Sequence, residues 1–256
     1  MKKNKIIVFG DLPIATKVVM ELNEMDNIDL VGVVIGNDNP HVNDPWDDVE
    51  CLSVYAKENN IRKYTLNDLV ENFDENDLDL GLLCRFSKIV KKDIISLFKT
   101  GLINMHGGLL PEFAGLYSCN YSILYNSKVG GGTLHFVDEG IDTGNIIKRC
   151  EFEITDEDTG FSVFQKTQIA LFEGMMEIIP KVLDNSIISI PISEFINKGY
   201  ESRYFNKKSI ELYKELKEGE LFTEEGLRRI RAFDFPGYEP AYYMLNNKKV
   251  YLRLTK

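Results

Sequence analysis

Two polar side chains that can do chemistry, Asn104 and His106, stand in the apolar run "LINMH" (102–106). Residues at i and i+2 of a strand point to the same side of a sheet, so both side chains project together. Two glycines follow, and glycines allow another molecule to approach the backbone closely. A histidine changes its charge near neutral pH. The pattern therefore predicts a reactive site at the end of this strand, with His106 at its centre.

A second candidate is the turn-rich segment "VDEGIDTGNI" (137–146), which carries the acidic residues Asp138, Glu139 and Asp142. By itself the segment is typical of a hairpin whose Asp and Gly residues make turns. Beside the asparagine–histidine pair it indicates more, because a loop aspartate can reach across a cleft and orient a histidine or raise its basicity.

The other two histidines are predicted to be structural. His41 lies in the polar loop "NDNPHVNDPWDD" (37–48), which indicates a surface position. His135 alternates with Thr133 and Val137, which indicates a packed or hydrogen-bonded strand residue. The three histidines are too irregularly spaced for a metal-binding motif, so we expect no metal.

The first strand ends in "FGDLPIAT", which has Gly10 but lacks the other glycines of a dinucleotide fingerprint. This disfavours binding of NAD. Open α/β sheets nevertheless bind ligands beyond the carboxyl ends of their strands. We therefore expect Gly10, Asp11 and Leu12 to border a substrate.

Apolar runs and helical spacings alternate along the first half of the chain. Strands are expected at residues 5–10, 28–36, 61–64, 78–84 and 102–106, and helices at 14–26, 52–60, 66–72 and 89–99. Such alternation predicts an α/β fold, Rossmann-like, with a mostly parallel sheet and helices on both faces.

The second half changes character after about residue 185. Further elements are expected as a helix at 118–126, strands at 131–138 and 145–154, helices at 160–184, 207–217 and 223–231, and a terminal hairpin at 241–245 and 250–254. We predict a catalytic domain over 1–185 and a small C-terminal α+β subdomain over 186–256 that ends in a β-hairpin.

Composition narrows the class of protein. The 256 residues carry a formal net charge of −10, whereas proteins that grip nucleic acid usually show a basic face, so no nucleic-acid partner is expected. No window approaches 18 apolar residues, and the first apolar run is too short for a signal peptide. The four cysteines form no C-x-x-C pair. These features predict a cytoplasmic protein with reduced thiols and no membrane partner.

Two segments match a known family. "NMHGGLLPEFAG" and, beyond an expected helix, "GGTLHFVDEGIDTG" resemble the 10-formyltetrahydrofolate-dependent formyltransferases. That family's pattern is N-x-H, a Leu-Leu-Pro loop, a strand and an Asp in a D-x-G segment, and the resemblance covers most of residues 1–180. The ending "RIRAFDFPGYEPAYYMLNNKKVYL" (229–252) resembles members that formylate amino sugars attached to nucleotides.

The resemblance implies that Asn104, His106 and Asp142 are catalytic and that a formyl group passes from 10-formyltetrahydrofolate to a primary amine. The amide of Asn104 and a donating His106 are suited to stabilise the oxyanion that develops. His106 is the expected base, with Asp142 fixing its state, and transfer of the proton through water to Asp142 is the alternative.

The resemblance also implies the ligand contacts. The expected folate contacts are Arg85, Phe86, Ser87, Ile89, Leu109, Asp138, Gly140 and Ile141. The expected contacts of the second substrate, the acceptor, are Gly10, Asp11, Leu12, Leu110, Pro111, Tyr117, Asn120 and Tyr121. Leu109, Leu110 and Pro111 are expected to shape the cleft between donor and acceptor.

The chain departs from the family where many members carry an Arg before the glycine that follows the Leu-Leu-Pro loop. This chain has Ala114-Gly115 there, which puts any role of that Arg in doubt. It also lacks the phosphate loop of glycinamide ribonucleotide formyltransferases, and it is shorter and more acidic than a typical methionyl-tRNA formyltransferase.

We therefore expect transfer to a nucleotide-linked amino sugar, for example a 4-amino-4,6-dideoxy sugar, in the synthesis of cell-surface polysaccharide such as lipopolysaccharide O-antigen. Glycinamide ribonucleotide and methionyl-tRNA are the alternative acceptors. A formyltetrahydrofolate hydrolase and a non-catalytic folate-binding protein are the alternatives outside transfer. The apolar terminal hairpin favours a homodimer.

Overall fold

The computed structural model describes residues 3–254, and its centre is one seven-stranded sheet in the order β3-β2-β1-β4-β5-β7-β8. Its parallel strands are β1 (Asn4–Gly10), β2 (Ile28–Val34), β3 (Lys63–Tyr64), β4 (Leu80–Cys84) and β5 (Leu102–His106). The antiparallel strands β7 (Val129–Phe136) and β8 (Ile146–Glu153) complete one edge. The predicted Rossmann-like fold is confirmed.

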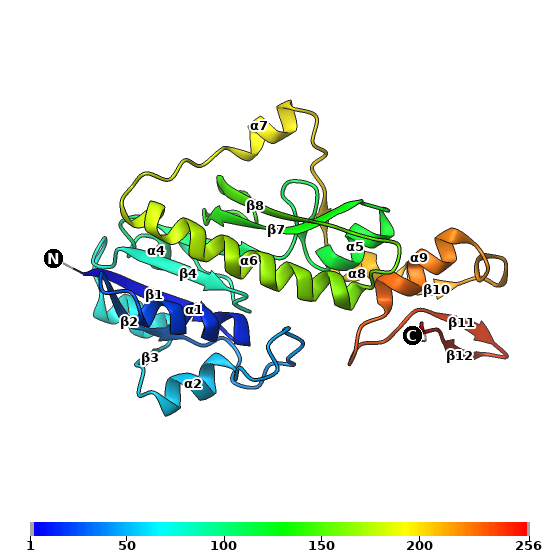
Figure 1. The fold of residues 1–256 in the computed structure, drawn as a ribbon, viewed down its shortest axis with the longest axis horizontal. Helices are drawn as coiled ribbons and strands as arrows, with labels where there is room; N and C mark the ends of the chain where they lie inside the picture. Colours follow the sequence, from blue (N-terminus) through cyan, green and yellow to red (C-terminus); the bar gives the residue numbers. More distant parts are fainter. Residues whose placement is uncertain (1–2, 255–256) are drawn as a thin grey trace.

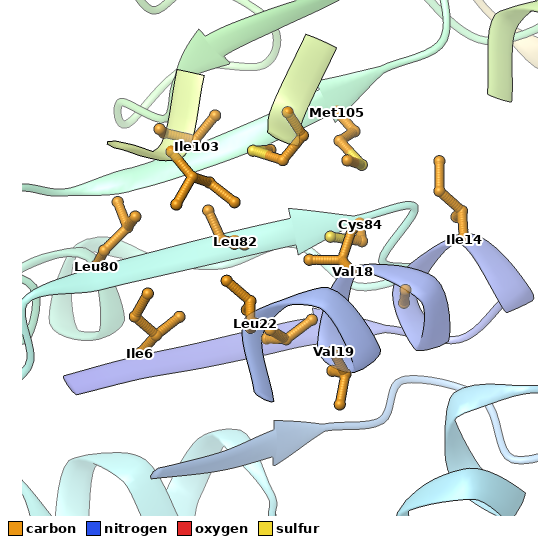
Figure 2. Packing of buried hydrophobic residues seen from close by; sticks show 14 of the residues in the cluster. Ile6, Ile14, Val18, Val19, Leu22, Leu80, Leu82, Cys84, Ile103 and Met105 are labelled. Atoms are coloured by element: carbon orange, nitrogen blue, oxygen red, sulfur yellow. The ribbon is translucent and has the colours of Figure 1, made fainter. Parts of the chain in front are cut away.

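Both faces of the sheet are covered because the central strands are apolar on both sides. Ile6 and Val8 of β1 join one core cluster, while Ile7 and Phe9 join another. The first face is covered by α1 (Pro13–Asn23), α2 (Leu52–Glu58) and α6 (Gly160–Leu183). Figure 1 shows α6 lying across the sheet, and Figure 2 shows Val18 and Leu22 of α1 among the side chains of the central strands. Both strand faces thus bury apolar surface, the main favourable term in folding.

The second face carries α3 (Leu66–Asn72) and α4 (Lys92–Ile95). The bounds of α3 agree with the sequence, because its ends are specified locally: the side chain of Thr65 accepts a hydrogen bond from the amide of Asp68, and the Asp68 carboxylate accepts one from the amide of Thr65. The helix expected at 89–99 is wrong in extent, since only four residues are helical. Beyond them, Phe98 forms a bridge with Leu78 beside the sheet.

Most of the remaining elements lie at one end of the molecule, whereas α7 (Ile192–Asn197) lies apart from them, beyond β8 (Figure 1). The other helices are α5 (Ser118–Leu124), α8 (Lys207–Glu211) and α9 (Glu224–Phe233), with a 3₁₀ turn at Glu218–Glu220. The short strands are β6 (Ala114–Gly115), β9 (Tyr204–Phe205), β10 (Glu215–Leu216), β11 (Tyr242–Leu245) and β12 (Lys248–Tyr251). A third apolar cluster joins α5 to α8 and α9.

The helix expected at 207–217 ends at Glu211, because Glu215 and Leu216 pair in parallel with Tyr242 and Tyr243. The predicted terminal hairpin is present as β11 and β12, which confirms the small C-terminal α+β piece. The domain boundary at residue 185 stays a prediction. Among residues 3–254, no helix has the length and apolarity needed to cross a bilayer.

Candidate active site

The fold brings Asn104, His106 and Asp142 together, and we call these three residues the triad. Asn104 and His106 lie at the carboxyl end of β5, and Asp142 comes from the loop that joins β7 to β8. The Nδ1 atom of His106 lies 3.4 Å from Oδ1 of Asp142, with the two side chains only 7% and 11% exposed. A pair this well shielded from water interacts more strongly than it would at the surface.

The proton on His106 can be placed from its partners. Its Nε2 lies 2.8 Å from the carbonyl oxygen of Phe113, and because a carbonyl only accepts, Nε2 carries a hydrogen. The other ring nitrogen, Nδ1, therefore faces the carboxylate of Asp142. That contact is attractive only when a proton lies on one of the two groups, so His106 and Asp142 form a pair that can take up and release a proton.

Asp142 is fixed by a backbone donor. The amide of Gly115 in β6 donates to Oδ2 of Asp142 at 2.9 Å, which leaves Oδ1 toward His106. Within the same loop, Oδ1 of Asp138 accepts hydrogen bonds from the amide of Gly140 at 3.0 Å and the hydroxyl of Thr143 at 2.6 Å. These bonds close the loop as an Asx-type turn and hold Asp142 in place.

His135 is a fourth member of this centre that the sequence did not assign to it. It lies opposite Asn104 in the β5–β7 pairing, and Nδ2 of Asn104 donates to its Nε2 at 3.1 Å. Nδ1 of His135 donates to the carbonyl oxygen of Phe136 at 2.8 Å, which leaves a lone pair on Nε2. The predicted hydrogen-bonded strand residue is thus present, and it orients the amide of Asn104. The two-residue alternation of β7 was the only signal for this position.

Burial and, to a smaller extent, the nearby His106 together lower the pKa of His135 to about 4. His135 is therefore neutral at pH 7 and accepts from Asn104. One N–H of the Asn104 amide is used in this bond, and the second remains available. The centre thus combines an oriented N–H donor with a proton-exchanging pair, which are the groups that acyl transfer requires.

Two cavities meet at this centre. The triad cavity, of about 560 Å³, is lined by Asn104, His106, Asp142 and the segments 85–90 and 138–142 around them. The aromatic cavity, of about 380 Å³, is lined by Phe164, Phe235 and Tyr238, together with the start of α5. Arg85 and the backbone at Gly115 and Leu116 border both cavities.

The residues described hold no group of three or more His, Cys, Asp or Glu side chains arranged to bind a metal ion.

Residues 3–179 match the family model described as formyl transferase, which is well over half of the chain. The chain belongs to the formyl transferase family. Among curated relatives, this formyl transferase is 27% identical over 190 residues to a methionyl-tRNA formyltransferase of Acetivibrio thermocellus. The match covers 72% of this chain and 61% of that relative's length.

Two solved structures match almost the whole formyl transferase chain. An N-formyltransferase from Helicobacter canadensis, in complex with folinic acid and dTDP-3-aminofucose, is 26% identical, with a TM-score of 0.74, over 98% of this chain and 86% of that one. WlaRD, a sugar 3N-formyl transferase solved in the presence of dTDP and 5-N-formyl-THF, is 27% identical, with a TM-score of 0.75, over 98% and 85%. Unlike the family model, both matches include the C-terminal elements.

Most of the folate contacts expected for this formyl transferase border the triad cavity. The expected residues that line it are Arg85, Phe86, Ser87, Ile89, Asp138, Gly140 and Ile141. Leu109 does not line it, because its side chain is buried in the third apolar cluster and lies against Gly131. The acceptor contacts divide: Leu12 lines the triad cavity, whereas Tyr117 and Asn120 line the aromatic cavity.

Five expected acceptor contacts of the formyl transferase are buried and line neither cavity, and the first two lie around β1. Gly10 is buried where any Cβ would collide with Ala15 and Cys84, so it serves the packing of α1 on β4. The Asp11 carboxylate accepts from the amides of Gly36 and Ser87 at 2.6 and 3.1 Å, which ties loops together. Both residues are therefore structural: Gly10 allows close packing, and Asp11 holds the loop of Ser87, which lines the triad cavity.

The other three lie in and beyond the Leu-Leu-Pro loop. Leu110 and Pro111 are buried, and the amide of Leu110 donates to Thr133 at 2.9 Å, so they anchor the loop rather than form a cleft wall. The ring of Tyr121 is 1% exposed and stacks on Phe205 with centroids 3.7 Å apart. This aromatic packing places Tyr121 in the core, outside the lining of both cavities.

Proposed function

We propose that this formyl transferase moves a formyl group from 10-formyltetrahydrofolate to the primary amine of a nucleotide-linked amino sugar. The observation that carries the proposal is the position of the triad where two cavities meet. One cavity fits a flat donor held by backbone groups, and the other offers aromatic side chains for a second substrate. Transfer between two bound molecules requires this arrangement, whereas hydrolysis and simple binding of folate do not.

In the proposed reaction the free N–H of Asn104 donates to the oxygen of the formyl group as negative charge develops there. One such donor contributes about 3–4 kcal/mol in acyl-transfer sites. A C–N bond forms between the amine and the formyl carbon, and the bond from that carbon to N10 of the folate breaks. The His106–Asp142 pair accepts the proton that the amine loses and returns one to N10, which contributes roughly 10²–10⁴-fold.

The donor is assigned to the triad cavity. Residues of segments 85–90 and 138–142 line this cavity, and we propose that their backbone groups hold the pterin ring. An ion pair at the surface, 2.9 Å long, connects Glu139 of the second segment to Lys92, which lies two residues beyond the first segment. The folate-type ligands of the two solved relatives support a folate donor.

The acceptor is assigned to the aromatic cavity. Phe235 and Tyr238 form an edge-to-face pair with centroids 5.2 Å apart, and Phe164 packs on Phe235. Aromatic rings that line a cavity and are at least partly exposed suit the stacking of a nucleotide base. The dTDP-sugar ligand of the Helicobacter canadensis relative favours a nucleotide-linked amino sugar over glycinamide ribonucleotide or methionyl-tRNA.

The setting of the enzyme is part of the same proposal. We infer a cytoplasmic homodimer that uses no metal and modifies a sugar destined for cell-surface polysaccharide, such as lipopolysaccharide O-antigen. The exposed residues Tyr251 and Leu245 of the terminal hairpin support a subunit contact there.

The test supplies 10-formyltetrahydrofolate with a panel of nucleotide-linked amino sugars and measures release of tetrahydrofolate together with the mass of the sugar product. We expect a product heavier by one CO group and no release with the matching hydroxyl sugar. Release that does not depend on any amine would instead identify a hydrolase. Formylation of glycinamide ribonucleotide or methionyl-tRNA in preference to every sugar would contradict the proposed acceptor.

A further inference from the structure

Arg85 lies where the two cavities meet and contributes to the lining of both. It follows β4 directly and has a φ of +57°, a left-handed conformation that is uncommon for residues other than glycine. Such strained positions persist only where the surrounding structure enforces them, and they cluster at functional sites. The conformation motivates a closer look at what the guanidinium contacts.

The guanidinium of Arg85 is held in place by packing. A Cβ at Gly107, the residue after His106, would lie only 2.7 Å from one of its terminal nitrogens, so the guanidinium lies directly against the chain beside the triad. On its other side it lies over the ring of Phe164, at 5.7 Å from the centroid. These contacts place the charge next to the triad and beside Phe164, which lines the aromatic cavity.

Among residues 3–254, no carboxylate lies within 4.0 Å of the Arg85 guanidinium, and its Nε is buried without a hydrogen-bond partner. Asp44 interacts with Arg85 only through its charge, because its carboxylate accepts from the amide of Ile14 at 2.9 Å and from Gln168 at 3.2 Å. An unsatisfied buried donor costs about 1–3 kcal/mol, which a ligand that accepts hydrogen bonds would offset.

The second cation of the aromatic cavity is already paired. Nζ of Lys214 lies 2.8 Å from Glu211 and 3.5 Å from Glu239, and both acids also line the cavity. Glu239 is paired with Lys249 as well, at 2.7 Å, so the charges around Lys214 are compensated, whereas Arg85 has no ion-pair partner within 4.0 Å among the residues described. An anionic group of the acceptor is therefore attracted to Arg85 rather than to the paired lysine.

We propose that Arg85 binds the diphosphate of the acceptor and so sets both the class of substrate and its orientation. This inference rests on the proposed transfer to a nucleotide-linked sugar and makes it more specific. The order of groups along the cavities matches the order within such a molecule: the triad meets the amine, Arg85 the diphosphate, and Phe235 and Tyr238 the base. Arginine binds phosphate oxygens with two parallel N–H donors, which fixes direction as well as affinity.

The alternative is that Arg85 contacts only the folate, as its place in segment 85–90 suggests. The pterin ring is uncharged, and the charged groups of a folate are the carboxylates of its distant glutamyl tail. Lys88 lies exposed at the rim of the triad cavity and is the matched cation for such a tail. Substitution of Arg85 is therefore expected to weaken binding of the acceptor, whereas substitution of Lys88 is expected to affect only the folate donor.

The experiment measures binding by calorimetry to the wild type, Arg85→Gln, Arg85→Lys and Lys88→Gln, each first checked for an unchanged melting temperature. The probes are dTDP, UDP, dTMP, thymidine and folinic acid. We expect Arg85→Gln to weaken binding of dTDP or UDP by about 10–100-fold while leaving thymidine and folinic acid within twofold. Arg85→Lys should restore part of the loss, and Lys88→Gln should leave the diphosphates unaffected.

Two results would overturn the inference: Arg85→Gln that loses folinic acid but keeps dTDP and UDP, or a wild-type protein that binds neither diphosphate more tightly than thymidine. Failure of the proposed function is a separate result, since diphosphate binding that depends on Arg85 can be observed even if no amino sugar is formylated. If Arg85→Gln proves unfolded, the arginine-to-lysine variant alone tests the inference, because loss of the two-pronged contact must weaken diphosphates more than thymidine.

Discussion

The roles of His106 and His135 depend on which ring nitrogen of each carries a hydrogen. The carbonyl oxygens of Phe113 and Phe136 each fix one ring nitrogen of a histidine as a donor. His106 is thereby turned toward Asp142, and His135 is kept as an acceptor for Asn104. The two histidines lie with ring centroids 6.4 Å apart yet have different tasks, because one shares a proton with a carboxylate and the other is buried as a neutral group.

The first prediction concerns the charge of His135. Because burial lowers its pKa to about 4, its imidazole signals should stay those of the neutral ring down to about pH 5. The chain has three histidines, so their resonances can be assigned by single substitutions. A titration by NMR spectroscopy checks the prediction, and a midpoint for His135 near 6.5 would contradict it.

The same shift predicts how stability depends on pH. Below about pH 6.5 His135 is protonated in the unfolded chain, whereas in the folded chain it stays neutral down to about pH 4. The free energy of unfolding therefore falls as the pH falls from 6.5 to 4. The contribution of this one group is at most about 3 kcal/mol. Urea unfolding at pH 7 and pH 4.5 should show a smaller loss for His135→Asn than for the wild type; equal losses in both proteins would rule out the shift.

At the scale of elements, the centre depends on contacts between short strands that lie far apart in the sequence. Strand β6 pairs with β9, so the C-terminal segment holds the backbone whose Gly115 amide fixes Asp142. The sequence marks this point only as Ala114-Gly115 in place of a family arginine. Gly115 has a φ of +89°, and a Cβ there would collide with the carbonyl of Phe205.

We therefore predict that Gly115→Ala separates β6 from β9 and removes the backbone donor to Asp142. Turnover should fall by roughly 10²-fold or more, because the acid–base pair loses its geometry. Gly219→Ala is the control, since nothing lies within 4 Å of a Cβ at that position, and it should leave turnover unchanged. Steady-state kinetics of both variants decide the matter, and similar rates for the two would contradict this role of Gly115.

A further element-scale prediction concerns the Leu-Leu-Pro loop. Arg149 donates to the carbonyl of Leu110 at 2.7 Å and forms a two-pronged pair with Glu112 at 2.7 and 2.9 Å, with its side chain 11% exposed. Arg149→Met leaves the Glu112 carboxylate shielded and unpaired, so unfolding should become easier by about 3–5 kcal/mol.

The matched control is Arg253→Met, which removes a more exposed pair with Asp234 at 3.2 Å. Its expected cost is below about 1 kcal/mol. Denaturant unfolding of the two variants measures both values. A loss for Arg149→Met no larger than that of the control would show that the loop does not depend on this pair.

The elements also show what sequence can and cannot determine. Helix α3 was predicted with its observed bounds because its capping residues act within four positions. The helices expected at 89–99 and 207–217 were predicted too long. Phe98 forms a bridge with Leu78, and Glu215 pairs with Tyr242, so neither residue can be helical. Tyr121 was expected at a ligand because its partner in stacking, Phe205, lies 84 positions later (205 − 121) and leaves no local signal.

For the whole molecule, the sequence predicted the parallel sheet and the pairing of Asn104 with His106, since strand period and the edge of a parallel sheet are general rules. The meeting of Asp142 with this pair was predicted mainly from the resemblance to the formyltransferase family. The sequence did not predict the division into two cavities, because the second is built from α5, α6 and C-terminal residues brought together only by the third apolar cluster. The assignment of acceptor contacts therefore changed most between sequence and structure.

The charge of the whole chain gives a prediction about its acceptor. With a net charge of −10, the protein should not bind tRNA measurably at about 150 mM salt, since such binding depends on cations that neutralise phosphates. Filter binding with initiator tRNA checks this, with nucleotide sugar as the positive ligand. Submicromolar binding to tRNA would favour the activity of the curated methionyl-tRNA formyltransferase relatives over the proposed one.

The most direct test of the central claim is the turnover of Asp142→Asn on a nucleotide-linked amino sugar, compared with the wild type. The wild type should produce the formylated sugar, and the variant should be slower by about 10²–10⁴-fold because the His106 pair no longer exchanges a proton. Binding of folinic acid and dTDP should remain within about threefold, since Asp142 serves proton transfer. Near-normal turnover of the variant, or a wild type that formylates no amine, would contradict the account.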